Sequence, residues 1–209
     1  MKPLRAVLGR KMNRYSEEVL YMGREDIAEL INAEVEGDKY VECHENPSFI
    51  AVSWIATYMV NKDKILNAVQ NARNRGVRGL CFEWSQFEAM LLALGRLIHS
   101  DYAEWVEANG GAAEVRISAS LNGVPIGGTA DVVYDDGEFV SVAELKTRRS
   151  AVADIQALIY AYLLSEELGD YVRPYVVNTS TVSIIRHDSE LIKHAKEVAN
   201  EIWKIVNST

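Results

Sequence analysis

Residues 124–146 read VPIGGTADVVYDDGEFVSVAELK, and this stretch decides the fold. Two alternating apolar runs flank the DDG sequence at 135–137, a pattern that favours a tight turn between antiparallel strands. Because side chains alternate between the two faces of a strand, Val142, Glu144 and Lys146 share one face of the second strand. The pattern therefore predicts a hairpin whose second strand ends in a carboxylate and an ammonium group.

Asp131 arrives near the same place from the first strand of this hairpin, between Ala130 and Val132. Ionisable groups at the end of a buried sheet are costly unless they are paired with one another or hold a cation. Carboxylate oxygens are hard ligands that suit Mg²⁺ or Mn²⁺. The cost of placing Asp131, Glu144 and Lys146 together is the reason to expect a functional site here.

Length and composition are those of an ordinary globular protein of 209 residues, which predicts one domain with additions. No apolar run reaches the roughly 18 residues of a membrane span, and the basic N-terminus lacks the apolar region of a secretory signal. Two cysteines, Cys43 and Cys81, argue against a disulfide framework and fit a reducing cytosol. We therefore expect a cytoplasmic protein.

Charge is unevenly distributed along the chain. The net charge of −8 argues against a protein that coats nucleic acid without specificity. Basic clusters are usually solvated faces, but clusters beside a carboxylate site also suit a phosphodiester substrate. Such clusters occur within residues 1–14, at Arg73, Arg75 and Arg78, and at Lys146, Arg148 and Arg149.

The order of expected elements predicts an α/β fold with a mixed central sheet flanked by helices. A capping box from Ser85 to Glu88 opens a long helix that ends near Ala108, and Ser150 opens a largely apolar helix that ends at Gly169. We expect a helical N-terminal region over 1–80 packed on a core over 81–209. The expected strands are 113–120, 124–134, 138–147, 171–177 and 181–187, and the other expected helices are 16–33, 47–60, 63–74 and 189–206.

These residues together resemble the PD-(D/E)xK nuclease superfamily, through Asp131 followed by Glu144-Leu-Lys146. Gln156 and Tyr160 match the QxxxY motif of its RecB-like branch, and the sequence GRLIH at 95–99 matches the histidine motif of that branch. Within the branch, the chain is most similar to the compact CRISPR-associated RecB-like exonucleases and their viral relatives.

The resemblance implies a restriction-endonuclease-like core with His99, Asp131, Glu144 and the Leu145 carbonyl as ligands of Mg²⁺ or Mn²⁺. It implies that Lys146 is catalytic, together with the two carboxylates. The residues expected to line the DNA path or brace the site are Gln156, Tyr160, Arg148 and Arg149, and Glu114 is a candidate for support from outside the ligand set.

Two departures from the family pattern stand out. Many members of the branch hold an iron–sulfur cluster on four cysteines, one before and three after the nuclease core. Cys43 and Cys81 both precede the core, so no iron–sulfur cluster is expected within one chain. Ala130 stands where the superfamily name has proline, at a position that supplies no ligand.

The leading hypothesis is a metal-dependent deoxyribonuclease that acts as an exonuclease on single-stranded DNA or DNA ends. Tyr160 and Trp84 or Trp105 are candidates for base stacking, although each also suits a core position. One alternative is a structure-specific endonuclease or junction resolvase with the same active site. A second is a non-catalytic DNA-binding or assembly protein that retains the fold. Taken alone, His99 also suits a structural histidine, and Glu144 and Lys146 suit a solvated pair at a strand end. The sequence does not predict the oligomeric state.

Overall fold

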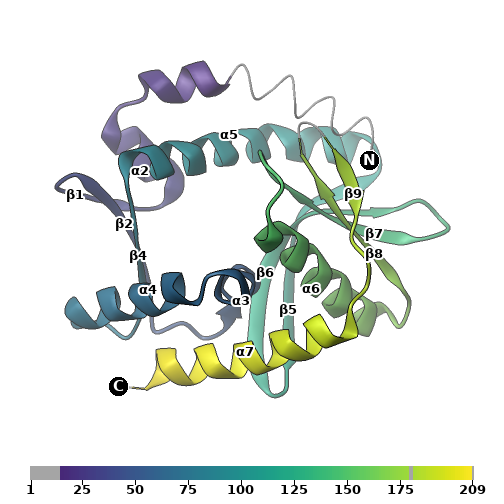
Figure 1. Ribbon diagram of the computed structural model, residues 1–209. Coiled ribbons are helices and arrows are strands. Elements are labelled where there is room, and N and C mark those ends of the chain that lie inside the picture. The colour runs from purple at the N-terminus through teal and green to yellow at the C-terminus, as the bar shows by residue number, and fades with distance from the viewer. Residues whose placement is uncertain (1–14, 179–180, 209) are drawn as a thin grey trace.

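The computed structural model describes residues 15–178 and 181–208, without the side chains of residues 100 and 101 (Figure 1). The basic segment expected at 1–14 lies outside these residues. The main sheet has six strands and is mixed, as expected, because its pairings are both parallel and antiparallel. Its strands are β3 (Ile50–Ala51), β5 (Gly111–Leu121), β6 (Val124–Asp135), β7 (Val140–Leu145), β8 (Val172–Val177) and β9 (Val182–Ile184).

Strand β6 organises this sheet because three other strands pair with it. Strand β5 pairs with β6 from Gly111 to Leu121 except at Glu114, whereas β3 pairs at 126–127 and β7 at 132–135. Since β5 occupies one edge of β6, the two short pairings share the other edge. The segment 128–131 lies between them, and no described strand pairs with β6 on that edge there. The backbone of this segment is therefore open to other parts of the chain.

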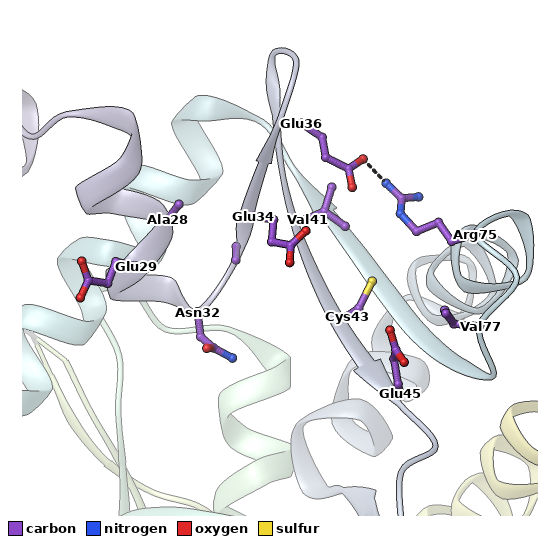
Figure 2. Close-up of a pocket in the computed structure, with 11 residues that line it drawn as sticks. Ala28, Glu29, Asn32, Glu34, Glu36, Val41, Cys43, Glu45, Arg75 and Val77 are labelled. Atoms are coloured by element: carbon purple, nitrogen blue, oxygen red, sulfur yellow. Dashed lines mark hydrogen bonds and ion pairs between the residues drawn. The ribbon is translucent and has the colours of Figure 1, made fainter.

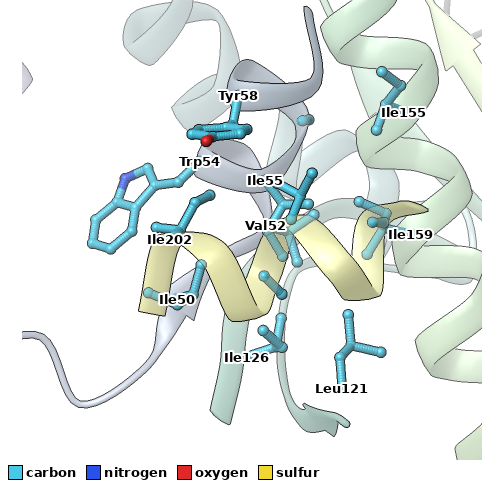
Figure 3. Close-up of a cluster of buried hydrophobic side chains, with 14 of the residues drawn as sticks. Ile50, Val52, Trp54, Ile55, Tyr58, Leu121, Ile126, Ile155, Ile159 and Ile202 are labelled. Atoms are coloured by element: carbon cyan, nitrogen blue, oxygen red, sulfur yellow. The ribbon is translucent and has the colours of Figure 1, made fainter. Parts of the chain in front are cut away.

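Helices cover both faces of the sheet, and each face has its own hydrophobic cluster. Figure 3 shows one cluster, in which Ile50, Ile126, Ile159 and Ile202 meet from four different elements. The helices packed on this face are α3 (Val52–Val60), α6 (Ala151–Leu168) and α7 (Ser189–Asn207). The other face is covered by α5 (Gln86–Ala108), and α2 (Arg24–Ile31) and the helical residues 15–21 extend its hydrophobic cluster, α2 by packing on α5.

Helix α6 connects the parallel strands β7 and β8 as a crossover and is buried on most sides between the sheet and α3. This position explains its nearly continuous apolar sequence. Ser150 caps its first turn by accepting a hydrogen bond from the Ala153 amide. Ser85 and Glu88 form the expected capping box at the start of α5.

The N-terminal region differs from the expectation because it contains a second sheet as well as helices. Strands β1 (Glu34–Glu36), β2 (Lys39–Glu45) and β4 (Gly79–Trp84) form an antiparallel wing, and α4 (Lys62–Asn74) packs on it. The sequence pattern predicted the helices 16–33, 47–60 and 63–74 in this region and none of these three strands. The glycine that breaks the helical pattern, Gly37, instead has a φ of 60° and forms a hairpin turn.

Polar residues of the wing pair among themselves. A hollow of about 560 Å³ lies between α2 and the wing, and several glutamates line it (Figure 2). Arg75 pairs with Glu36 at 2.6 Å and with Glu83 at 3.3 Å, and Lys39 also pairs with Glu83. These ion pairs give Arg75, one member of the basic cluster at 73–78, a structural role in the wing.

The two cysteines correct another expectation. Cys43 and Cys81 lie directly opposite each other on β2 and β4, with Cα atoms 4.1 Å apart, and form a disulfide. Separation by 38 residues gave no indication of this, because strand pairing rather than spacing brings them together. The number of cysteines therefore does not support a reducing compartment for this chain.

Smaller differences concern where helices begin and end. The helix expected over 16–33 is interrupted at Gly23, and the helix expected over 63–74 begins at Lys62, capped by Asn61. The strand expected over 181–187 is regular only over Val182–Ile184. No helix in the described ranges has both the length and the apolarity that crossing a bilayer requires.

Candidate active site

The two acidic residues predicted for the site lie at the end of the β6–β7 ladder. The last pair of this ladder is Val132 with Ala143, and Asp131 and Glu144 are the next residues beyond that pair on their strands. The Leu145 amide donates a 2.7 Å hydrogen bond to Asp131 Oδ2, which fixes the Asp131 carboxylate at the end of β7.

Strand β6 is locally distorted at Asp131. Ala130 and Val133 both pack in the cluster beneath α6, whereas Val132 packs in the cluster beneath α5, so the alternation of faces shifts at this point. Across the ladder, Glu114 has a φ of 49°, in the left-handed region that non-glycine residues seldom adopt. Local breaks of this kind re-aim side chains next to functional sites.

Glu114 itself does not reach the site. Its side chain is exposed and makes no hydrogen bond or ion pair within the described part of the chain. Its connection to Asp131 is the break in the strand ladder rather than a side-chain contact.

His99 reaches this end of the sheet from α5. Its Nδ1 atom lies 3.4 Å from Asp131 Oδ1, and its Nε2 atom lies 3.3 Å from the Leu145 carbonyl oxygen. Both neighbours are acceptors, so a neutral imidazole donates to one of them and keeps a lone pair on the other nitrogen. The histidine, the Asp131 carboxylate and the Leu145 carbonyl are thus brought together as the sequence predicts.

Glu144 is the most deeply buried of the predicted site residues, with a relative accessibility of 1%. Its Oε2 atom pairs with Lys146 Nζ at 3.0 Å, but its Oε1 atom is buried and has no hydrogen-bond partner among the described residues. Burial, and after it the charge of Asp131, raises the pKa of the Glu144 carboxyl to about 8.

Lys146 compensates this buried negative charge. Burial lowers the pKa of its ammonium, but the carboxylates of Glu144 and Asp131 raise it, and the net shift is upward. Its side chain is still 31% exposed, so the ammonium lies between the buried acid and solvent. The Lys146 amide also donates to the Val177 carbonyl at 3.0 Å, which anchors this residue to the end of β8.

Tyr160, on α6, packs against Gly128 in the segment of β6 that has no strand partner on one edge. A Cβ atom placed on Gly128 would lie only 2.3 Å from the Tyr160 hydroxyl oxygen, so this contact requires glycine. Burial raises the pKa of Tyr160, and the charges of Glu144 and Asp131 raise it further, while a hydrogen bond with the Thr129 backbone acts in the opposite direction.

The remaining predicted residues lie in the first turns of α6 or in the segment just before it. Gln156 is buried one turn before Tyr160. Arg148 and Arg149 are exposed where the chain enters the helix, and Arg149 pairs with Asp154 at 3.1 Å. These two arginines are therefore near the site in sequence and topology but do not contact the acidic residues.

The sequence analysis missed Arg96, whose positive charge acts on Lys146. Its position three residues before His99 on the same helix is the signal that could have identified it. The protein side chains by themselves do not form a complete metal cage, because no three His, Cys, Asp or Glu side chains cluster tightly enough in the described part. The assembled groups are two pairs, His99 with Asp131 and Lys146 with Glu144, joined by the backbone of Leu145.

Comparison with solved structures finds the same fold in proteins of very different sequence. SSO0001 aligns over 93% of this chain and 88% of its own, with a TM-score of 0.52 and 15% identity. A protein from Eubacterium rectale that bears the name "Putative exonuclease" aligns over 77% of this chain and 82% of its own, with a TM-score of 0.50 and 12% identity. No protein-family model matches the chain, and no curated protein matches it.

Replacing Gly128 by alanine tests the approach of Tyr160 to β6. We expect Gly128→Ala to reduce the free energy of unfolding by about 1–3 kcal/mol, because the added methyl group meets the Tyr160 hydroxyl. The double variant with Tyr160→Phe should recover part of this loss. Gly95→Ala is the matched control, since no atom lies within 4 Å of its added Cβ. Denaturant unfolding measures all four proteins, and wild-type stability of Gly128→Ala would contradict the contact.

The raised pKa of Glu144 predicts how stability depends on pH in the absence of metal. The folded state holds the proton up to about pH 8, whereas the unfolded chain releases it near 4.5, so ionising Glu144 costs stability as pH rises through this interval. Glu144→Gln removes that cost. We expect its Tm advantage over wild type in EDTA to grow by roughly 5–10 °C between about pH 5 and pH 8.5.

Glu201→Gln is the control for this experiment, because the exposed Glu201 has a lowered pKa through its hydrogen bond with Lys62. Its Tm difference from wild type should not rise with pH. A Tm difference between Glu144→Gln and wild type that is the same at both pH values would show that Glu144 ionises normally.

Proposed function

We propose that this protein is a metal-dependent deoxyribonuclease that hydrolyses phosphodiester bonds, acting as an exonuclease on single-stranded DNA or DNA ends. The observation that carries the proposal is the buried Glu144 Oε1 atom, which has no hydrogen-bond partner among the described residues and lies within the electrostatic influence of the Asp131 carboxylate. A buried acceptor without a partner is costly, and a cation held by these acids would remove that cost. The likeness in fold to a protein named as a putative exonuclease is consistent with this function.

The donor set fits a hard divalent cation. Asp131, Glu144 and the Leu145 carbonyl offer oxygen, and His99 offers nitrogen, which suits Mn²⁺ as well as Mg²⁺. When bound, such an ion supplies Lewis acidity, neutralising phosphate charge and lowering the pKa of water. Asp131 is held for this role by the Leu145 amide, and His99 by its position on α5.

Lys146 has the position of a group that acts on the reacting phosphate or on the attacking water. Its ammonium is partly exposed and lies 3.0 Å from the buried Glu144 carboxylate. With Glu144 as a metal ligand, the Lys146 ammonium would be available to donate hydrogen bonds to the developing negative charge or to orient water. Its backbone amide, bonded to the Val177 carbonyl, keeps it at the end of β7.

The surroundings of the site favour a nucleic-acid substrate over a small phosphate ester. Arg148 is exposed beside the site and has no ion pair within the described residues, and Arg96 adds a second cation from α5. Positive charge on two sides of an acidic site attracts a phosphodiester backbone. These features support DNA binding along the rim between α5 and α6.

The direct test is cleavage of end-labelled single-stranded DNA by wild type, Glu144→Ala and Lys146→Ala with Mn²⁺, Mg²⁺ or EDTA. We expect wild type to release short products with either metal and none with EDTA. Each substitution should lower the rate at least about 100-fold, because it removes a ligand or the charge-stabilising ammonium. Glu201→Gln is the folded control, and full activity of Glu144→Ala would refute the nuclease assignment.

The same digest separates exonuclease from endonuclease activity. Circular single-stranded DNA has no ends, so an exonuclease leaves it intact while degrading the linear form. Cleavage of both forms at equal rates would instead favour a structure-specific endonuclease or junction resolvase with the same site.

A further inference from the structure

The β5–β6 hairpin has one face covered by helices and one face that is bare. Ile117, Leu121 and Ile126 are buried in the cluster beneath α6. Side chains alternate along a strand, and directly paired residues project from the same face, so the positions between these three point the other way. Five of those positions are exposed and form what we call the bare face: Arg116, Ser118, Ser120, Pro125 and Thr129.

The bare face lies on the same side of the sheet as α5, but α5 does not extend over it. Ala113 and Val132 are paired with each other and pack in the cluster beneath α5. Coverage by α5 stops after this pair, at the local distortion of β6 at Asp131. Figure 1 shows the hairpin continuing from there, away from α5 and toward α7. The candidate active site therefore adjoins an uncovered part of the sheet.

Arg116 is the charged residue of the bare face, and it lies close to the site along the strands. It pairs with Thr129, and Asp131 follows Thr129 by two residues, a distance of about 7 Å along β6. The Arg116 side chain is exposed and makes neither a hydrogen bond nor an ion pair with any described residue. Because arginine carries its charge on a long aliphatic stem, this guanidinium group is free to reach toward a molecule held at the site.

Phe49 limits the bare face on the side away from the site. A Cβ atom placed on Gly127 would lie 2.6 Å from the Phe49 ring, so the ring lies directly on this glycine, and Phe49 is 45% exposed. Gly127 precedes Asp131 by four residues, or about 13 Å of strand. Between the Phe49 ring and Asp131, the floor is short, with Thr129 at its middle and Arg116 beside it.

The chemistry of this floor suits a phosphate group. The other members of the bare face are small or uncharged, so Arg116 determines its charge. A guanidinium group presents a planar fork of donors that matches a phosphate in a bidentate manner. A polynucleotide with one phosphate at the metal site carries its next phosphates one nucleotide away on either side, and one of these directions leads over Thr129.

We propose that Arg116 is a specificity-determining residue that binds the phosphate next to the one that is cleaved. Through this contact the site distinguishes a polynucleotide from a substrate with a single phosphate. The inference rests on the proposed nuclease function. It adds a substrate contact on the hairpin, on a different side of the site from the rim between α5 and α6.

The test compares two substrates in Mn²⁺: an end-labelled linear oligonucleotide, and the p-nitrophenyl ester of thymidine 5′-phosphate, which has one phosphate. We expect Arg116→Ala to raise KM for the oligonucleotide about 10-fold or more, with kcat nearly unchanged, because a charged hydrogen bond outside the reacting group is lost. Hydrolysis of the ester should be unaffected. Arg116→Lys should recover part of the loss, since it keeps the charge but not the fork.

Arg186→Ala is the matched control, because it removes an exposed cation elsewhere. An oligonucleotide KM for Arg116→Ala equal to that of this control would overturn the proposal. Equal losses for the oligonucleotide and the ester would also overturn it, since Arg116 would then act on the site itself or on folding.

Binding of a fluorescein-labelled oligonucleotide to the full chain in EDTA, measured by fluorescence anisotropy, separates this proposal from the nuclease assignment. Arg116→Ala should weaken binding relative to Arg186→Ala and reduce the slope of log affinity against log salt by about 1. If wild type hydrolyses neither substrate but Arg116→Ala loses affinity in this way, the nuclease fails and the phosphate contact stands. If wild type hydrolyses both substrates and Arg116→Ala binds as the control does, the contact is wrong and the nuclease remains.

Discussion

A carboxylate that folding removes from water is the constraint around which the ends of β6 and β7 are arranged. Glu144 is 1% exposed, is affected by the charge of the nearby Asp131, and among the described residues has Lys146 as its charged partner at 3.0 Å. A buried acid, a partly buried acid and one amine leave a deficit of positive charge that costs stability. The chain carries a carboxylate at position 144, between the buried Ala143 and Leu145, where an apolar side chain would avoid this cost. A site of this kind is a functional candidate on physical grounds.

The surrounding fold serves to hold this group in place. Strand β6 leaves 128–131 without a partner on one edge, which admits Tyr160 against Gly128 and leaves the Asp131 side chain free to meet the Leu145 amide. Helix α5 spans the opposite face and delivers His99 to the same point. The site therefore lies where residues 128–131 of β6 separate its pairings with β3 and β7, and several elements contribute side chains to it.

The sequence predicted the parts of this arrangement that local pattern controls. Alternation and the DDG turn located β6 and β7, and the capping box located α5. The nearness of Asp131 and Glu144 at the end of the hairpin followed from the same pattern. The wing was missed because Gly37, which forms the turn between β1 and β2, is a residue type that also ends helices, and the disulfide was missed because strand pairing brings Cys43 and Cys81 together. Arg96 was missed because its effect on Lys146 is electrostatic and acts between segments that are far apart in the sequence.

Direct calorimetric titration of the metal-free protein with Mn²⁺ near neutral pH tests the central claim, that Asp131 and Glu144 share a cation site. The account predicts binding to wild type and to Glu201→Gln, and loss of binding in Asp131→Asn and Glu144→Gln. It also predicts that wild type releases a proton as Glu144 becomes a ligand, which appears as a binding enthalpy that depends on the buffer. Equal Mn²⁺ affinity in wild type and Glu144→Gln would contradict the account.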